Sequence, residues 1–429
     1  SIKVLTDFEY VDLSIDEKSI LPFDTAEKPT QNYTYDFTSA DEGKIVVKQR
    51  EESNKEKTLD TYRFYDGFGR LIQTKKEAES DKQIVVDTYY DKQGRVNATS
   101  NPYFSSFSAV YTTPDTTVNL TIYEYDLLDR VTKVINPDGT FKTINYIHWN
   151  ITVLDENQNR KDYILDAYSN IIKVIENNNG INYTTNYEYN EANELILITD
   201  SLGNNFSYYY NLLGRKVASI DPDRGVINYS YDKVGNLVQQ NDSRGVNLTI
   251  QYDELNRKTK EITGILNRTY LYDINQNDTL SSVLIIPDKT IINYSYDNRS
   301  RKTEQNISID GINWTILYTY DSLDRIKTKN LPNKKIITNT YNTQGLLNST
   351  RGIIYVAYNE KDQITNITYS NSLLSNYTYR KDNFRLINLK TGEIQLLNYS
   401  YDNIGNVLEI NDSANGKRYI MQYDDLDRL

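Results

Sequence analysis

The sequence predicts an all-β protein made of tandem β-hairpins. A short motif recurs along the chain: Tyr-x-Tyr-Asp, two further residues, Gly or Asn, then Arg or Asn and an aliphatic residue. A second turn signal falls about halfway between successive motifs, and the segments between turns alternate apolar and polar residues. The clearest copies of the motif end in Tyr231-Asp232, Tyr252-Asp253, Tyr320-Asp321 and Tyr401-Asp402. Self-similarity at a fixed period is the signature of a repeat architecture.

The positions equivalent to the motif Asp give the period of the array. They are Asn190, Asn211, Asp232 and Asp253, each 21 residues after the last, then Asp273, Asp297, Asp321, Asn342, Asn359, Arg380, Asp402 and Asp424, with looser spacing upstream at Asp66, Asp91, Asp126, Asn150 and Asp166. We therefore predict an irregular β-rich lead-in over residues 1–60 and a repeat array over 61–429, loosely spaced in 61–165 and regular in 166–429. The array is expected to continue beyond 429 or to be completed by another copy.

Each repeat should be one hairpin, because two turns in about 21 residues leave two strands of roughly seven residues. The second turn is visible in Asp200-Ser201-Leu202-Gly203 and Asp221-Pro222-Asp223-Arg224-Gly225. Residues 247–252 show the alternation, with Leu, Ile and Tyr on one face and Asn, Thr and Gln on the other. Twisted sheets seldom pass about ten strands without curling. We therefore expect one long sheet, curled into a spiral, tube or hollow shell with its tyrosine face inward.

The motif residues themselves are interpreted as structural. We expect the Asp side chain to accept hydrogen bonds from backbone N–H groups at the start of the turn, and the Arg to reach a neighbouring repeat. Asn at 190, 211, 342 and 359 fits this role, since it keeps an acceptor and loses the charge. The predicted structural residues are Tyr231, Asp232, Tyr252, Asp253, Tyr320, Asp321, Tyr401 and Asp402.

The unit Tyr-Asp-x-x-Gly-Arg-Leu, seen at Tyr65–Leu71 and in a close variant at Tyr90–Val96, resembles the YD repeat of the RHS family. Residues 61–104 are similar to the stretch that leads into this array in RHS and toxin-complex B and C proteins. The resemblance implies a β-sheet wound into a hollow cocoon, as in bacterial toxin-delivery shells, wall-associated proteins and teneurins. In toxin-type members the array ends at an aspartate self-cleavage site around Asp-Pro. Here the only Asp-Pro, Asp221-Pro222, lies inside an ordinary repeat, and no toxin domain is visible.

N-glycosylation sequons are unusually frequent. Asn-x-Ser/Thr occurs at Asn32, Asn97, Asn150, Asn182, Asn205, Asn228, Asn241, Asn247, Asn267, Asn277, Asn293, Asn298, Asn306, Asn313, Asn348, Asn366, Asn376, Asn398 and Asn411, and also at Asn119. In copies such as Asn228-Tyr229-Ser230 the Asn points away from the tyrosine face, so glycans would project outward. Asn119 shares parity with Tyr123 and is left out of the predicted set. The alternative is that Asn, Ser and Thr are simply favoured in turns and on wet strand faces.

Composition gives no catalytic, metal or cofactor site. The chain has no cysteine, which excludes disulfides and thiolate ligands, and one histidine, His148, interpreted as an ordinary outward strand residue. Asp-rich turns at 221–225 and 411–416 could bind calcium, but Asp, Asn and Gly are the usual turn residues. A net charge of -11 argues against a nucleic-acid partner. No apolar run is long enough to span a membrane.

Two functions remain open. The first is a non-enzymatic, N-glycosylated extracellular protein with a structural or adhesive role at the cell surface, possibly a filament subunit. It would associate with itself or with other surface proteins or glycans, and sheet edges near Ile2–Leu5 and Leu429 would be its contacts. The alternative is an RHS-type cocoon that encloses and delivers a toxin domain outside this chain. The charged run 48–57 is interpreted as a solvated loop or hairpin tip without function.

Overall fold

The computed structural model describes residues 14–22, 24–38, 42–274 and 276–429, and its secondary structure there consists of strands and turns. The first ten strands are β1 Ser14–Ser19, β2 Gln31–Asp36, β3 Glu42–Arg50, β4 Thr58–Asp66, β5 Leu71–Glu77, β6 Lys82–Tyr90, β7 Val96–Ser100, β8 Tyr103–Ser106, β9 Leu120–Tyr125 and β10 Val131–Ile135. The next ten are β11 Phe141–Ile147, β12 Asn150–Leu154, β13 Arg160–Leu165, β14 Ile171–Asn178, β15 Ile181–Tyr189, β16 Leu195–Thr199, β17 Asn205–Tyr210, β18 Lys216–Asp221, β19 Gly225–Tyr231 and β20 Leu237–Asp242. Then follow β21 Asn247–Tyr252, β22 Lys258–Thr263, β23 Leu266–Tyr272, β24 Leu280–Ile286, β25 Thr290–Tyr296, β26 Lys302–Ile309, β27 Ile312–Tyr320, β28 Ile326–Asn330 and β29 Ile336–Thr338. The last are β30 Thr340–Tyr341, β31 Leu347–Ser349, β32 Ile353–Tyr358, β33 Ile364–Tyr369, β34 Leu374–Tyr379, β35 Leu386–Thr391, β36 Gln395–Tyr401, β37 Val407–Asp412 and β38 Lys417–Ile420.

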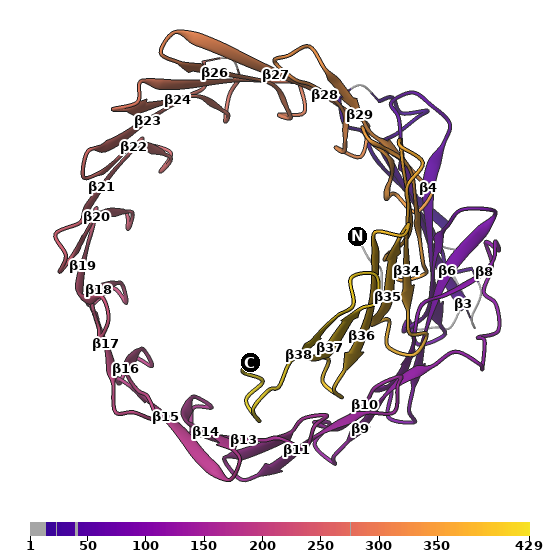
Figure 1. The fold of residues 1–429 in the computed structure, drawn as a ribbon, viewed down its shortest axis with the longest axis horizontal. Helices are drawn as coiled ribbons and strands as arrows, with labels where there is room; N and C mark the ends of the chain where they lie inside the picture. The colour runs from indigo at the N-terminus through magenta and orange to yellow at the C-terminus, as the bar shows by residue number, and fades with distance from the viewer. Residues whose placement is uncertain (1–13, 23, 39–41, 275) are drawn as a thin grey trace, which may run out of the picture. The chain divides into compact units, whose positions relative to one another are not determined.

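The strands form antiparallel hairpins mostly in chain order (Figure 1), except that β8 returns to pair with β6 while β7 pairs with β9. Strands β1 to β29 belong to one sheet of 29 strands, β30 and β31 pair separately, and β32 to β38 form a sheet of seven. The predicted all-β class and the predicted array of hairpin repeats are confirmed. Because a strand of the repeats is otherwise followed by its own partner, alternate turns lie at opposite rims of the sheet. We call them YD turns, which follow the Tyr-Asp motif, and intervening turns.

Most YD turns begin with a β-bulge. In β19 and β20, Ser230 pairs with Gln239 but the next residue, Tyr231, pairs with Leu237, so one residue of β20 has no partner. The same shift recurs at most of the motif tyrosines, for example between Gln251 and Tyr252. The fourth turn residue has a left-handed backbone, which Gly, Asn and Asp adopt most readily. The Gly or Asn of the motif is therefore explained by the turn geometry.

The ladder breaks at Asn339, where one uninterrupted sheet was predicted. The backbone N–H of Asn339 donates to the Lys327 carbonyl at 2.9 Å, and its side-chain amide donates to the Ile326 carbonyl at 3.0 Å. Its Oδ1 accepts from Thr350 Oγ1 at 2.7 Å. A side chain thus takes hydrogen-bonding positions that a continuing strand would use, and β29 and β30 are separated at this residue.

The chain divides into two compact units. The first comprises residues 1–142, 319–329 and 336–422, and the second comprises 143–318, 330–335 and 423–429. The first unit holds a small apolar core of Val46, Tyr62 and Phe64, with Ile72 and Tyr111 packed against it. Tyr111 belongs to the segment 107–118 between β8 and β9, which we call the strap.

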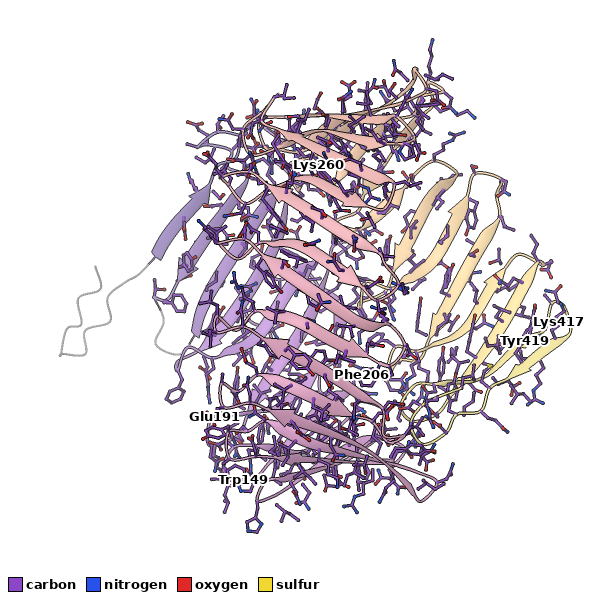
Figure 2. The ribbon with its side chains drawn as sticks, turned by 90° about the vertical axis from the view of Figure 1, so that its left-hand side faces the viewer. Trp149, Glu191, Phe206, Lys260, Lys417 and Tyr419 are labelled. Carbon is purple, nitrogen blue, oxygen red and sulfur yellow. The ribbon has the colours of Figure 1, made fainter. Side chains whose placement is uncertain are left out.

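In the second unit the two sheet faces differ as the alternation predicted. Ile250 is buried and its neighbours Leu248 and Tyr252 are half-buried, whereas Asn247 and Gln251 on the other face are exposed. The rims are visible in Figure 2, where the labelled Glu191 lies at the rim of the YD turns and Phe206 lies toward the opposite rim. The buried face positions the motif tyrosines for contacts between repeats.

Candidate functional site

The YD turn is closed by its Asp side chain. Asp232 Oδ1 accepts the backbone N–H groups of Val234 at 3.0 Å and of Asn236 at 2.8 Å, and Oδ2 accepts the Asn236 amide at 2.9 Å. Burial opposes ionisation of this carboxyl, but the hydrogen bonds from Asn236 and its neighbours outweigh it and hold the pKa of Asp232 below its ordinary value. The carboxylate is thus held in place as a turn acceptor.

The second carboxylate oxygen, Oδ2, accepts a hydrogen bond from the side chain of the residue four positions later. Where that residue is Arg, its Nε donates to Asp Oδ2 at 2.6 to 2.8 Å, as in the turns that begin at Asp66, Asp91, Asp126, Asp253, Asp297, Asp321 and Asp424. Where the first residue is Asn, its amide instead donates to an acceptor: Asn190 to Glu194 at 2.6 Å and Asn359 to Gln363 at 3.0 Å. The sequence contains this i, i+4 pattern, and a comparison of repeats would have found it.

Two turns break the pattern. Asn211 is followed at the fourth position by Arg215, whose Nε is enclosed and donates to no partner among the described residues. Asn342 is followed by Leu346, and Asn342 Nδ2 is likewise enclosed without a partner in the described structure. Each mismatch leaves a buried polar atom unsatisfied, which costs stability.

The motif tyrosine links each repeat to the one before it. Its hydroxyl donates to the backbone carbonyl of the first strand residue after the previous YD turn: Tyr231 to Lys216 at 2.7 Å, Tyr252 to Leu237 at 3.0 Å, Tyr401 to Leu386 at 2.7 Å. The same bond occurs at Tyr90, Tyr125, Tyr189, Tyr210, Tyr272, Tyr296, Tyr341, Tyr358 and Tyr379. A Tyr is suited to this position because its ring packs while its hydroxyl reaches a partner.

The motif Arg adds a second link. Arg325 stacks over Tyr341 of the next repeat at 4.1 Å and donates to the Gly345 carbonyl at 3.1 Å. Arg257 pairs with Asp253 of its own turn at 2.8 Å and with Asp273 of the next turn at 2.6 Å. Successive repeats are therefore joined by polar and cation–π contacts as well as by the strand ladder. Of the predicted site residues, Asp232, Asp253, Asp321 and Asp402 begin such turns, and Tyr231, Tyr252, Tyr320 and Tyr401 end the strands before them.

The sequon asparagines are exposed or half-buried. Twelve are exposed: Asn119, Asn150, Asn182, Asn205, Asn228, Asn247, Asn277, Asn293, Asn298, Asn313, Asn398 and Asn411. The half-buried ones are Asn32, Asn97, Asn241, Asn267, Asn306, Asn348, Asn366 and Asn376. In five of these, at 32, 97, 241, 267 and 348, Oδ1 is enclosed with no hydrogen-bond partner in the described part of the chain. Asn119, which was left out of the predicted set, is exposed and donates to the Pro137 carbonyl.

A buried polar cluster fixes the strap to the first unit. Gln73 makes two bonds with Thr112, donating to its carbonyl at 2.9 Å and accepting its N–H at 3.2 Å, and it also donates to Asp87 at 2.6 Å. Lys75 donates to the Val110 carbonyl at 2.6 Å. Burial lowers the pKa of Lys75 and raises that of Asp87. Sequence reasoning missed this cluster because the strap has no repeat period.

Later YD turns of the first unit contact its earlier intervening turns. Ser322 donates its backbone N–H to the Glu51 carbonyl at 3.0 Å, and the hydroxyls of Ser322 and Ser53 lie 2.9 Å apart. Lys327, just after the same turn, pairs with Glu52 at 2.7 Å. The charged run 48–57 ends β3 and forms a hairpin tip, as predicted; residues 54–57 of the tip are exposed to solvent, whereas Glu51 is buried.

The same pairing of turns recurs three more times. Asp362 binds Lys76 at 3.2 Å, next to the turn between β5 and β6. Asn383 donates to Asp138, in the turn between β10 and β11, at 2.8 Å. Within the second unit, Asp424 and Asp425 bind Asn178 and Asn179 of the turn between β14 and β15 at 3.0 and 2.6 Å. In all four contacts a YD turn of a later repeat meets an intervening turn of an earlier one.

The histidine, the acidic side chains and the membrane question were also addressed by the sequence predictions. No group of three or more His, Cys, Asp or Glu side chains is arranged to hold a metal ion there. His148 lies in the two-residue turn between β11 and β12 with a φ of 53°, so its interpretation as a strand residue was wrong. No helix long and apolar enough to cross a membrane occurs in the described ranges.

Known structures share this fold. Residues 37–145 match a domain of unknown function, DUF6443. The crystal structure of TcdB2-TccC3 aligns with 96% of this chain at 19% identity and a TM-score of 0.81, and TcdB2-TccC3-Cdc42 aligns with 90% at 19% identity and 0.80. A Tc holotoxin pore from Photorhabdus luminescens aligns with 90% of the chain at 19% identity and 0.79. The chain spans about a quarter of the length of those chains, 24 to 25%. No curated protein matches the sequence significantly. The resemblance to YD-repeat shell proteins is confirmed for the fold.

Proposed function

We propose that this chain is a wall segment of a YD-repeat shell that encloses a polypeptide cargo, and that its role is structural and not catalytic. The observation that carries the proposal is the recurring contact between later YD turns and earlier intervening turns. In each of these contacts a hairpin of a later repeat lies against a hairpin of an earlier repeat. A shell wall built from successive windings of one sheet requires contacts of this kind. The fold likeness to TcdB2-TccC3 over 96% of the chain supports the same function.

The interlocked repeats suit a wall. Tyr-to-carbonyl bonds and Arg stacking tie each repeat to the next, so an opening between repeats would break several contacts at once. The tyrosine face offers aromatic rings to an unfolded cargo chain, which needs apolar contacts. This function replaces the surface-adhesive role as the leading proposal.

Electron microscopy of the native protein that contains this chain, isolated without denaturation, tests the proposal. A shell wall gives discrete hollow particles of uniform size, with an internal polypeptide that resists added protease until the particle is opened. Regular fibres with a constant axial repeat would contradict the shell. Particles in which the added protease cleaves every polypeptide segment without prior opening of the particle would contradict it too.

A second candidate function is an N-glycosylated extracellular role in structure or adhesion. The exposure of twelve sequon asparagines favours it, because an oligosaccharide requires an accessible amide. Glycopeptide mass spectrometry on protein from its source cells decides the matter. Occupancy at exposed sites such as Asn228 and Asn247, with little at Asn241 and Asn267, supports it. Unmodified asparagine at all exposed sites would end it.

A further inference from the structure

The second unit has exposed apolar side chains at both rims. On the YD-turn rim, Leu213, Val234 and Leu255 are 72%, 74% and 63% exposed. On the intervening-turn rim, Leu202 and Ile265 are 84% and 86% exposed. A large aliphatic side chain at a turn tip gains nothing from its own hairpin, and rows of such groups mark interaction surfaces.

The rims that are already in contact have a different composition. None of the described residues in the contacted turns at 51–57, 78–81 and 136–140 is a large exposed apolar side chain, and the same is true of the YD turns at 321–325 and 359–363. Exposed apolar tips lie instead on turns outside these four contacts, in the second unit and also in the first, where Phe68 and Leu127 are 86% and 102% exposed. Whether a turn tip carries an exposed apolar side chain therefore depends on whether the turn makes such a contact, and not on whether it is a YD turn or an intervening turn.

The geometry points to a second copy of this chain as the occupant: we propose that the YD-turn rim of one copy's second unit stacks on the intervening-turn rim of another copy's second unit. This inference does not rest on the shell function, because it uses only the rims. The polarity is taken from the four internal contacts, in which a YD turn always meets an intervening turn.

Two further observations favour a second copy. Both rims come from one array, so their turn tips have the same spacing of two strands, about 10 Å, and can remain in register over many repeats. The intervening-turn rim also continues directly from the turn at Asn178 and Asn179, which already binds Asp424 and Asp425. A copy seated beyond this turn would extend an existing interface.

The YD-turn rim also has a groove that could receive an apolar side chain from a turn of the second copy. A groove lies between the neighbouring turns that begin at Asp232 and Asp253, and Val234, Val238 and Tyr252 are among its lining residues. A side chain such as Leu202 of the second copy would enter a groove of this kind. Five turns, each burying on the order of 160 Å², would reach the roughly 800 Å² per partner that specific interfaces bury.

Such a contact is heterologous, because two different surfaces meet, and this provides the test. One variant blocks the intervening-turn rim with Leu202→Asp and Ile265→Asp, and the other blocks the YD-turn rim with Leu213→Asp and Leu255→Asp. Asp is well tolerated in turns, so both variants should fold, which circular dichroism verifies. Ser230→Asp, on an exposed strand face, is the matched control.

Sedimentation velocity of the whole chain gives the result. We expect concentration-dependent association of the unmodified chain and the control, and at least tenfold weaker association of each rim variant alone. Mixing the two variants should restore a 1:1 dimer that grows no further, since each has one intact rim. A monomeric unmodified chain over a broad concentration range overturns the proposal, and so does a mixture that stays monomeric or a single-rim variant that associates as well as the control.

Discussion

The mismatched turn at Asn211 predicts a substitution that stabilises the protein. In Asn211→Asp, the new carboxylate would receive the Arg215 Nε, which is enclosed and without a partner among the described residues. Seven other turns show this bond at 2.6 to 2.8 Å between Asp Oδ2 and Arg Nε. The backbone N–H bonds that Asn211 Oδ1 already accepts, from Leu213 and Arg215, would remain.

The magnitude follows from the bond that is gained. A hydrogen bond to a charged group contributes about 1.5–3 kcal/mol, and partial solvent exposure reduces this to about 1–2 kcal/mol. Because a repeat array opens locally, the gain should be read at the turn itself and not from a global midpoint. Hydrogen exchange of the backbone amides of Leu213 and Arg215 should slow by roughly 5 to 30-fold.

Asn236 provides the comparison within the array, because the Asp232–Asn236 turn is already matched and its amides should not change in the variant. Unaltered or faster exchange at Leu213 and Arg215 would refute the matching of first and fifth turn residues. It would mean that the unpaired Arg215 Nε does not lower the stability of the turn. The Asp–Arg hydrogen bonds of the other seven turns would then not explain why the motif has these residues.

Three further predictions follow from the same contacts. Asn190→Asp should destabilise its turn, because it places a carboxylate against Glu194, and faster exchange of the Glu194 amide measures this. Gln73→Leu should release the strap at a cost of about 3 kcal/mol, since it leaves Asp87 and Thr112 without their buried partner, and protease cleavage within 107–118 reports it. The hydrogen bond from the Arg428 side chain, helped by backbone hydrogen bonds, lowers the pKa of Asp424 from 3.8 to about 2. The Asp424–Arg428 pair therefore stabilises the turn above pH 4, and this stabilisation is lost as the pH falls toward 2. Exchange of the Leu426 amide should therefore accelerate in that window, and a flat profile would contradict the assignment.

Local features of the fold were predictable from sequence because they repeat. The Tyr-Asp motif predicted one turn of every hairpin, the signal at residues such as Asp221 predicted the other, and alternation predicted which face is buried. These depend on backbone geometry and on neighbouring residues, which a periodic sequence displays many times. The fifth residue of the turn was equally visible, but its role as partner of the first became clear only from the hydrogen bonds.

Long-range features were not predictable. Three features occur only once: the strap, the contact of Ser53 with Ser322 and the break at Asn339. A feature that does not repeat leaves no periodic signal in the sequence. Ser53 and Ser322 are separated by 269 residues, and two serines in polar turns carry no sequence signal of contact. His148 was misassigned because a two-residue turn between strands is too short to interrupt the alternation.

The stacking of a later YD turn on an earlier intervening turn is the central claim, and one disulfide tests it most directly. The chain has no cysteine, so Ser53→Cys with Ser322→Cys introduces a single possible pair. The two hydroxyl oxygens are 2.9 Å apart, and a small adjustment brings two sulfurs to a bond length of about 2.0 Å. We predict that mild oxidation forms an intramolecular bond in nearly all molecules, detected by non-reducing electrophoresis, whereas each single-cysteine variant gives none. A double variant that stays reduced, or that cross-links only between molecules, would contradict the account.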